Sequence, residues 1–372
     1  MRVPLFDLQA QERAVASETM AAVQRVAGEA RFILGPTVES FERWLAGACG
    51  TAHAVGVASG TDAIELALRA LGVGEGDAVV TPAFSFVAAA EAIACTGARP
   101  VFCDVEAATM NASGRTVREA IARVRAAGLR VAACVPVHLF GAIADVGELE
   151  IPIVEDAAQA IGARDGGGRM AGSLGRAAGF SFFPTKNLGA WGDGGAVVTS
   201  DDELAARLRR LRAHGASAPY VHEELGRNSR LDALQAAVLL AKAAHLAAWQ
   251  AARARLAAGY LERLAALPLT LPASPPAPAA PAWHAFVVRC RSQGERVALA
   301  AWLRERGVET RVYYPVPLHR QPCFASLREP ALPVAEEACR TALALPIHPT
   351  MTDAQHAHVV EQVHAFFAAR AA

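Results

Sequence analysis

The sequence predicts an α/β fold in which a large domain with a mostly parallel sheet is followed by a smaller α+β domain at the C-terminal end. Three observations predict it. Short apolar, β-rich runs alternate with helical patterns through the first 250 residues. The runs are apolar at successive positions, as in strands that helices cover on both faces. A proline-rich stretch, residues 268–283, then separates this pattern from the rest of the chain.

The elements of the large domain, residues 1–250, follow from this alternation. One helix is expected over 61–70 and another over 202–213. The second opens with Ser200-Asp-Asp-Glu203, a pattern typical of a capping box that satisfies the first free N–H groups of a helix. The expected strands are six short apolar runs: 78–80, 100–104, 131–137, 151–155, 179–182 and 196–199.

A long helix is expected to lead out of the large domain. Its alanine-rich pattern covers residues 231–267 and ends at Pro268. The small domain is then residues 268–372. Its expected elements are, in chain order, a strand over 284–288, a helix over 297–306, a strand over 309–312 and two further helices.

Length, charge and cysteine usage limit the classes of protein to which the chain can belong. Its 372 residues can bury a large core and exceed the usual size of one domain. Lysine plus arginine and aspartate plus glutamate are both 36, which argues against nonspecific binding to nucleic acid or to a membrane surface. The seven cysteines are dispersed, without CxxC pairs, which favours reduced thiols and gives little support to a metal site.

The sequence gives no sign of export or of a membrane span. The first residues, MRVPLFDLQAQER, lack an apolar stretch long enough for a signal peptide. The most apolar internal stretch, residues 78–103, contains Pro82, Glu91 and Arg99 and fits a strand, a helix and a strand. We therefore expect a cytoplasmic protein.

Lys186 and Asp156 are the most informative residues of the chain. Lys186 lies in the run GFSFFPTKNLGAWGDGGAVV, and Asp156 closes the apolar run IPIVED thirty residues earlier. A lysine amine can form a Schiff base with an aldehyde cofactor, and a carboxylate at a strand end can keep a pyridine nitrogen protonated. The amine must be unprotonated, so its pKa must fall well below about 10.4, and desolvation by neighbouring phenylalanines favours that. Alone, each residue is better explained as an ordinary surface lysine or a strand-end carboxylate.

A candidate phosphate site is the second chemical signal. In ASGTDAIELAL, Ser59-Gly60-Thr61 precede a helix whose free N–H groups can hold an anion. A simple helix cap explains this motif better when it is taken alone. The run GDGGA at 192–196 lacks the spacing of a dinucleotide fingerprint and is expected to be a turn into a strand. Three histidines have no metal-ligand spacing: His138, His214 and His319.

Together these motifs resemble the DegT/DnrJ/EryC1/StrS family of sugar aminotransferases, which depend on pyridoxal phosphate (PLP). The segments that carry the resemblance are ASGTDAIELAL (58–68), TPAFSFVAAAEAI (81–93), VEDAAQAIGA (154–163), SFFPTKN (181–187) and LGRNSRLDALQAAVL (225–239). The likeness covers nearly the whole chain, and the combination is highly specific. It implies the fold of type I PLP enzymes and a homodimer in which segment 225–239 reaches into the neighbouring subunit's site.

The resemblance also assigns roles around the cofactor ring. Lys186 would form the Schiff base and move the proton during transamination, and Asp156 would hold the pyridine nitrogen protonated. Phe86 would stack on one face of the ring, opposite the side of Gln159. Related dehydratases carry histidine in place of this lysine, so Lys186 favours transamination.

The phosphate and the substrate have their own implied contacts. Gly60, Thr61 and Ser181 would bind the cofactor phosphate, and Asn228 would join them from the other subunit. Arg230, from the same segment as Asn228, would meet a phosphate or a sugar carboxylate. The run VYYPVPLHRQPCF (312–324) resembles the segment that lines the sugar end of the site, which makes three residues candidates for substrate binding: Tyr313, Tyr314 and His319.

The resulting hypothesis is an aminotransferase that moves an amino group from L-glutamate to a keto group, at C3, of a nucleotide-linked sugar for polysaccharide or glycoconjugate biosynthesis. The resemblance favours a UDP-linked 2-acetamido-3-keto sugar slightly over a dTDP-linked 3-keto-6-deoxy sugar. A uronate is disfavoured because Tyr313 stands where a histidine would help to bind its carboxylate. Alternatives that stay open are a C4-keto sugar or cyclitol aminotransferase and a non-catalytic PLP-binding regulator.

Overall fold

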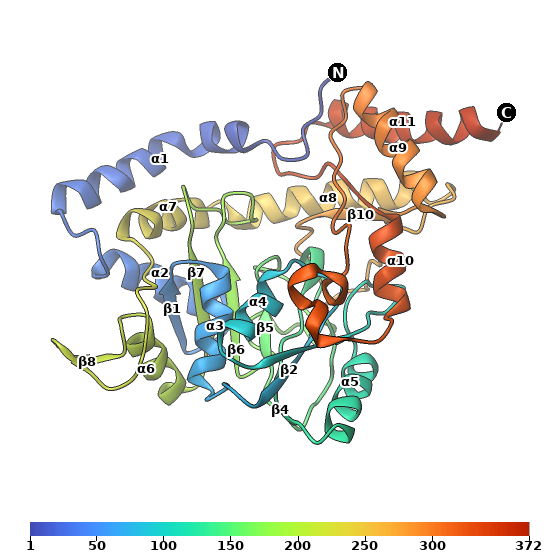
Figure 1. Ribbon diagram of the computed structural model, residues 1–372. Coiled ribbons are helices and arrows are strands. Elements are labelled where there is room, and N and C mark those ends of the chain that lie inside the picture. The colour runs from blue at the N-terminus through green and yellow to red at the C-terminus, as the bar shows by residue number, and fades with distance from the viewer. Residues whose placement is uncertain (372) are drawn as a thin grey trace.

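The computed structural model describes residues 1–371, and a twisted sheet lies at the centre of its large domain (Figure 1). Two isolated bridges, Cys134 with Ile153 and Val137 with Asp156, join a three-stranded and a four-stranded sheet. In spatial order the strands are β3 (Arg99–Cys103), β2 (Asp77–Pro82), β4 (Arg130–Cys134), β5 (Val154–Asp156), β6 (Ala177–Ser181), β7 (Gly195–Thr199) and β1 (His53–Val57).

The pairing of these strands confirms the mostly parallel α/β sheet that the sequence predicts. β2 pairs in parallel with β3 and β4, and β5 pairs in parallel with β6. β7 is antiparallel to both of its neighbours, β6 and β1. β1 therefore runs in the same direction as β6, and their carboxyl ends lie at the same edge of the sheet.

Helices cover both faces of the sheet, so the strands are buried along their length. One face packs against α3 (Gly60–Ala70), α4 (Ala88–Cys95) and α6 (Asp202–Leu211). The other face packs against α2 (Pro36–Cys49), α5 (Gly114–Ala126) and α7 (Ala233–Ala243). Successive strand residues alternate between the faces, as Val197 and Val198 of β7 do. Helix α1 (Leu8–Glu29) packs on α7 and forms an outer layer on that side.

The start of α6 differs from the predicted capping box. The N-cap of α6 is Asp201, whose carboxylate accepts a hydrogen bond from the backbone N–H of Leu204. Ser200 lies one residue too early, and its hydroxyl accepts a hydrogen bond from the backbone N–H of Ala52 instead. An aspartate cap also places negative charge at the positive end of the helix dipole.

The long helix expected over 231–267 is in fact two helices, α7 and α8 (Leu246–Leu264), which lie nearly in line in Figure 1. The break falls at Ala244 and His245, where the N–H of His245 bonds to the carbonyl of Lys242, three residues back, instead of four. The side chains on both sides of the break turn to α1: Lys242 pairs with Glu12, and His245 lies 2.7 Å from Glu18. Packing against α1 therefore accompanies the interruption.

The C-terminal part builds a second core around a small antiparallel pair of strands. β10 (Phe286–Arg289) pairs with β11 (Ala342–Leu345), and α8, α9 (Gln293–Glu305) and α11 (Asp353–Ala371) pack around them. β11 was not predicted, because ALAL fits a helix pattern as well as a strand. The strand expected over 309–312 is reduced to an isolated bridge between Arg311 and Ala344.

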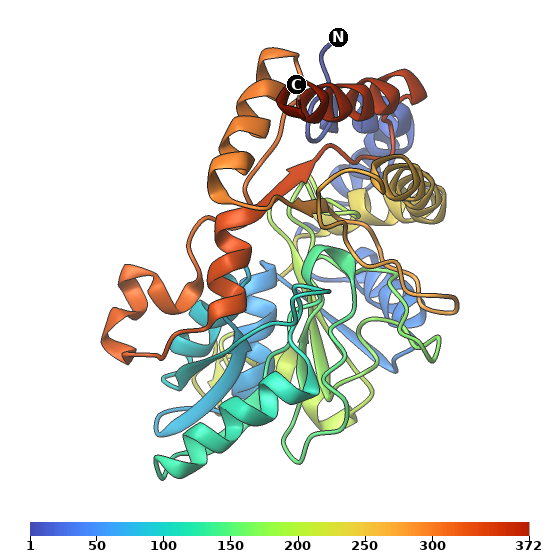
Figure 2. The same cartoon turned by 90° about the vertical axis from the view of Figure 1, so that its right-hand side faces the viewer.

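The N-terminal end of the chain packs into the C-terminal core. Val3 is fully buried in the C-terminal core, and its backbone bonds to Gly307 and Glu309. The chain termini accordingly lie on the same side of the molecule (Figure 1). The segment with η2 (Leu318–Arg320), η3 (Pro322–Leu327) and α10 (Pro333–Thr341) instead packs on the core of the large domain (Figure 2).

A hairpin extends from the large domain beyond α6. It comprises β8 (Ala216–Ala218) and β9 (Val221–His222), and it projects at the lower left of Figure 1. Tyr220 at its tip is 98% exposed, and Leu225 behind it is 91% exposed. Within residues 1–371, no helix combines the length and the apolar character needed to cross a membrane.

Candidate active site

The side chains with chemical potential lie just beyond the carboxyl ends of parallel strands. Ser59 and Gly60 follow β1, Asp156 ends β5, and Lys186 follows β6 by five residues. These strands point in the same direction, so their ends meet at one edge of the sheet. Ligands of open α/β sheets bind at this edge.

Lys186 lies in a closed loop that leaves β6. The backbone N–H of Lys186 bonds to the carbonyl of Phe183, and the N–H of Ala190 bonds to the carbonyl of Phe182, each at 2.8 Å. The lysine side chain is half-buried. Burial lowers its pKa to about 8, and the nearby Asp156 carboxylate opposes that shift. The amine is therefore largely neutral at moderately alkaline pH, as a nucleophilic lysine requires.

Asn187, the residue next to the lysine, is held in place by hydrogen bonds with Ala282 and His284. The amide nitrogen of Asn187 donates to the carbonyl of Ala282 at 2.7 Å, so its amide oxygen faces Nδ1 of His284 at 3.2 Å and accepts a hydrogen bond from the Nδ1–H. Burial first, and then the charge of Lys186, hold the pKa of His284 well below its usual value. His284 is thus a neutral neighbour that donates from Nδ1.

Asp156 is a buried carboxylate with one hydrogen bond from the described part of the chain. Its Oδ1 accepts from the backbone N–H of Ala158 at 3.1 Å. Burial raises the pKa of Asp156, and the bond from Ala158 and the charge of Lys186 oppose this shift. A buried carboxylate of this kind is stabilised by a further cationic or N–H partner, which a protonated pyridine nitrogen would provide.

The preceding residue, Glu155, points to the other face of the sheet and fixes the strand. Its carboxylate accepts from the backbone N–H groups of Gly172, Leu174 and Gly175 and lies 2.8 Å from Nε2 of His138. Burial alone would raise the pKa of Glu155, but these hydrogen bonds lower it overall. The carboxylate is therefore a charged anchor for the end of β5.

The start of α3 can bind an anion, and only glycine permits its geometry. The hydroxyl of Ser59 caps the helix by accepting from the N–H of Asp62 at 3.1 Å. A Cβ at Gly60 would lie 2.6 Å from Cβ of Ser181, so the helix start and the end of β6 are in direct contact. The free N–H groups at a helix start and the hydroxyl of Ser181 are suitable donors for a phosphate. With Asp156 and Lys186 at the same sheet edge, these residues fit the ring nitrogen, aldehyde and phosphate of PLP.

The residues expected at the two faces of the ring, Phe86 and Gln159, both lie beside Tyr314. Phe86 is 56% exposed, and its ring lies 6.1 Å from that of Tyr314. Gln159 accepts a hydrogen bond from the N–H of Phe140 at 2.7 Å and donates one to the hydroxyl of Tyr314 at 3.2 Å. Tyr314 is thereby held close to both, and Tyr313 lies beside it at 5.4 Å between ring centres.

His319 is the predicted substrate residue that the structure does not bring to this group. Its side chain is fully buried, and Nε2 lies 2.9 Å from Glu336 of α10. The ring packs near Phe102 of β3. The 3₁₀ turn that carries His319 places its ring between Phe102 and Glu336, so a structural role explains this histidine better than substrate binding.

Asn228 and Arg230 flank a residue that binds the start of α3. Ser229 between them donates to the Asp62 carboxylate at 2.6 Å and accepts from the N–H of Ala58 at 3.2 Å. Asn228 is exposed. Nε of Arg230 is buried without a hydrogen-bond partner in the part of the chain that the structure describes.

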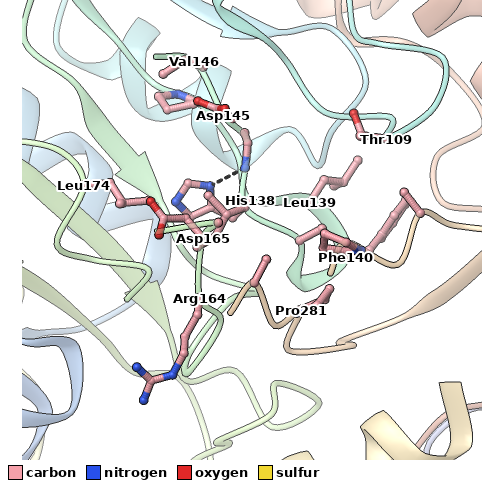
Figure 3. Close-up of a pocket in the computed structure, with 18 of the residues that line it drawn as sticks. Thr109, His138, Leu139, Phe140, Asp145, Val146, Arg164, Asp165, Leu174 and Pro281 are labelled. Atoms are coloured by element: carbon pink, nitrogen blue, oxygen red, sulfur yellow. Dashed lines mark hydrogen bonds between the residues drawn. The ribbon is translucent and has the colours of Figure 1, made fainter. Parts of the chain in front are cut away.

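A cavity of about 940 Å³ lies on the far side of β5 and does not contain Lys186 or Asp156 (Figure 3). His138 is at its centre, between the loop of Asp145 and the turn of Asp165, and the proline-rich linker with Pro281 closes another side. Its lining also contacts the active site: the backbone N–H of His138 bonds to the carbonyl of Asp156, and the N–H of Phe140 bonds to the side-chain oxygen of Gln159. No group of three or more His, Cys, Asp or Glu side chains among residues 1–371 is placed to hold a metal ion.

Several residues that hold the lysine loop were not predicted from the sequence. Asn187 and His284 act on one end, and Glu12 and Lys242 contact the other. One signal was present: Lys186 and Lys242 are the two lysines of a chain with 36 lysines and arginines.

Comparison with known proteins gives a consistent result. The model of the DegT/DnrJ/EryC1/StrS aminotransferase family matches residues 13–364. A dTDP-3-amino-3,4,6-trideoxy-alpha-D-glucose transaminase of Streptomyces venezuelae is 45% identical over 97% of this chain and 95% of that protein. A UDP-N-acetyl-3-dehydro-alpha-D-glucosamine 3-aminotransferase of Acidithiobacillus ferrooxidans is 42% identical over 96% of each chain. A pleiotropic regulatory protein of Geobacillus stearothermophilus is 42% identical over 99% of each.

Solved structures agree with the fold. The crystal structure of DesV from S. venezuelae, in complex with a ketimine intermediate, superposes with a TM-score of 0.92 at 44% identity and covers 98% of each chain. The structure of NtdA from Bacillus subtilis holds the cofactor PMP. It superposes with a TM-score of 0.89 at 28% identity, over 98% of this chain and 85% of that one.

Replacing Gly60 by alanine is expected to weaken PLP binding by roughly 100-fold, because the new Cβ would force the phosphate site and Ser181 apart by about an ångström. Equilibrium titration of the apo-protein with PLP measures the effect. Gly47→Ala on α2 is the matched control, since nothing lies within 4 Å of its Cβ. Equal affinities in the two variants would show that Gly60 does not shape the cofactor site.

Replacing Asp156 by asparagine is expected to lower the pKa of Lys186 further below about 8, because the carboxylate favours the charged ammonium in the native protein. The neutral amine would then persist to lower pH. Acetylation of the apo-protein at a series of pH values, with mass analysis of the Lys186 peptide, measures this pKa. If the pH midpoint of Lys186 acetylation is unchanged or higher in the variant, the electrostatic pairing of Lys186 with Asp156 is contradicted.

Proposed function

Because the chain belongs to the DegT/DnrJ/EryC1/StrS aminotransferase family, we propose that it uses PLP to move an amino group from L-glutamate to the C3 keto group of a nucleotide-linked sugar. The observation that carries the proposal is the meeting of Lys186, Asp156 and the Gly60–Ser181 contact at one edge of the sheet. Each matches a different part of PLP: the aldehyde, the ring nitrogen and the phosphate.

The chain's own residues supply the acid–base chemistry. When bound, PLP supplies an aldehyde that condenses with amines and a ring that takes up electrons from the bond broken at the donor's α-carbon. Asp156 holds a proton on the ring nitrogen and so makes the ring a better electron acceptor. Nζ of Lys186 is neutral above about pH 8, so it can take a proton from the reacting carbon and return it. Asn187 keeps the lysine loop in place during this transfer.

Aromatic side chains enclose the site where the ring and the sugar would meet. Phe86 is exposed toward Tyr314 and is suited to stack on one face of the ring. Gln159 fixes the hydroxyl of Tyr314. Tyr313 and Tyr314 would then line the sugar end and exclude water from the reacting carbon.

A shared site in a homodimer is part of the proposal. The hairpin of β8 and β9 projects with Tyr220 and Leu225 almost fully exposed, which suits a segment covered by a second copy. Asn228 at its base is exposed and can reach a partner's phosphate site. Arg230, whose Nε has no hydrogen-bond partner among residues 1–371, would bind a phosphate or diphosphate of the substrate, because a guanidinium binds phosphate with several N–H groups.

The relatives support two candidate nucleotides, dTDP and UDP. Relatives with similar identity act on a dTDP-linked 3-amino sugar and on a UDP-linked 3-dehydro sugar. We favour the UDP-linked 2-acetamido-3-keto sugar, in a cytoplasmic pathway toward a polysaccharide or glycoconjugate. The seven free thiols support a reducing compartment.

A regulatory role is the second candidate, because one relative is a pleiotropic regulatory protein. A regulator that only binds PLP has no need for a lysine with a pKa near 8 next to a buried carboxylate. The same groups are what transamination requires. The enzyme is therefore the first candidate.

Supplying L-glutamate and a panel of C3-keto and C4-keto sugars on UDP and dTDP tests the function. We expect amination of C3-keto sugars, with UDP-linked substrates the better ones, and products identified by mass and by the position of the new amine. The Lys186→Ala variant should retain less than about 1% of the turnover, since the group that moves the proton is gone. Amination confined to C4 would overturn the regiochemistry, and turnover by the Lys186→Ala variant would overturn the mechanism.

Mixing two inactive chains tests the shared site. One chain carries Lys186→Ala, and the other carries Asn228→Ala with Arg230→Ala. In a heterodimer, one of the two sites would contain every native group, so we expect activity to return toward one quarter of the native level for random 1:1 assembly. Heterodimers that form but stay inactive would show that each site is built from a single chain.

A further inference from the structure

The second lysine of the chain contacts the loop that carries the first. Lys186 and Lys242 are the two lysines among 36 lysines and arginines, so this chain uses arginine at nearly every other basic position. Lys242 lies on α7 and is 2% exposed. The function described above gives it no role, although a buried lysine is uncommon without one.

Three side chains hold the far end of the lysine loop, and we call them the loop clamp: Glu12 of α1, and Gln235 and Lys242 of α7. Nζ of Lys242 donates to the carbonyl of Gly189 at 2.9 Å and pairs with the Glu12 carboxylate. The other oxygen of Glu12 accepts from Nε1 of Trp191 at 2.6 Å. The amide oxygen of Gln235 accepts from the backbone N–H of Trp191 at 2.8 Å.

The loop transmits the position of its far end to Lys186. Its two arms are joined by the hydrogen bond from Ala190 to Phe182, and Lys186 lies between them. A Cβ at Gly189 would lie 2.3 Å from the carbonyl oxygen of Pro184, so the arms touch through their backbones. A shift of Gly189 would therefore move Pro184 and, two residues on, Lys186.

A lysine suits this position better than an arginine. Its ammonium is compact and can donate to a carbonyl and a carboxylate at once, whereas a guanidinium is a wide planar fork. Burial lowers the pKa of Lys242, and the Glu12 carboxylate opposes that shift. Because a buried ion pair gains little net stability over apolar side chains, this pair is better explained by the geometry that it imposes.

We propose that the loop clamp positions Lys186 for attachment of the cofactor, which makes Glu12, Gln235 and Lys242 positioning residues. The proposal rests on the assignment of Lys186 as the lysine that binds PLP. The clamp connects the N-terminal helix to the active site. Glu12 lies on α1, 230 residues before Lys242 in the sequence.

The test measures both thermal stability and the attachment of PLP to Lys186 in three variants of the full chain: Lys242→Met, Glu12→Met and the double variant. The thermal midpoint is measured for each, and attachment is followed by the absorbance of lysine-bound PLP as PLP is titrated in. Each single variant should lose stability because it leaves a buried or half-buried charge unpaired, and the double variant should recover it. Attachment in the double variant should remain roughly tenfold weaker, since a small displacement of Lys186 costs that much or more.

A matched ion pair elsewhere controls for general destabilisation. Arg123 donates to the carbonyl of Phe102 at 2.7 Å and to the carboxylate of Glu329 at 3.0 Å, which reproduces the contacts of Lys242 at a site away from the lysine loop. Arg123→Met with Glu329→Met should leave attachment unchanged. Native-like attachment in the clamp double variant, or equal weakening in the control pair, would overturn the proposal.

A milder pair of substitutions keeps the test valid if the double variant fails to fold. Gln235→Leu removes the acceptor for the N–H of Trp191, whereas Gln235→Glu keeps an oxygen there. We expect attachment to weaken roughly threefold or more in the first and to recover in the second. Equal attachment in both contradicts the clamp. If the native protein itself shows no lysine-bound PLP, the proposed function fails and not the clamp alone.

Discussion

The site depends on one balance: at Lys186 and at Asp156, burial shifts the pKa in one direction and the charge of the other residue shifts it back. Burial lowers the pKa of the lysine to about 8, while the carboxylate alone would keep it protonated. The same burial raises the pKa of Asp156, and the lysine charge restrains that rise. Moving either group by a few ångströms would change both pKa values, so the rest of the structure serves to keep them in place. Glu155 anchors the strand of Asp156, and Asn187, His284 and the loop clamp hold the loop of Lys186.

The parallel sheet brings these groups together from distant parts of the chain. Four strands that run in the same direction each deliver one function at the same edge: an anion site after β1, an aromatic ring after β2, a carboxylate at β5 and an amine after β6. The contact between Gly60 and Ser181 shows how closely two of these strand ends approach. The C-terminal core is also connected to the active site. Residues 282–284, at the start of that core, bond to the lysine loop and to the turn at Phe140 and Gly141.

Much of this arrangement could be predicted from the sequence, because it depends on local patterns. Apolar runs predict the central strands, the motif around Gly60 predicts a helix start, and Asp156 and Lys186 are predicted at the end of one strand and in the loop after another. β1 was missed, since HAVGV is short and contains a glycine, and the break at Ala244 was missed because alanine favours a continuous helix. The burial of His319 and the pairing of Glu12 with Lys242 could not be read from sequence, since both depend on how separate elements pack. The scarcity of lysine was the one sequence signal for the loop clamp.

The most direct measurement is to identify the residue that holds the cofactor. The protein is loaded with PLP, reduced with borohydride and digested, and the two lysine-containing peptides are weighed. We expect the mass of the reduced cofactor on the peptide with Lys186, and we expect this label to be lost if L-glutamate is added before reduction. A label on Lys242, or no label on either peptide, would contradict this expectation.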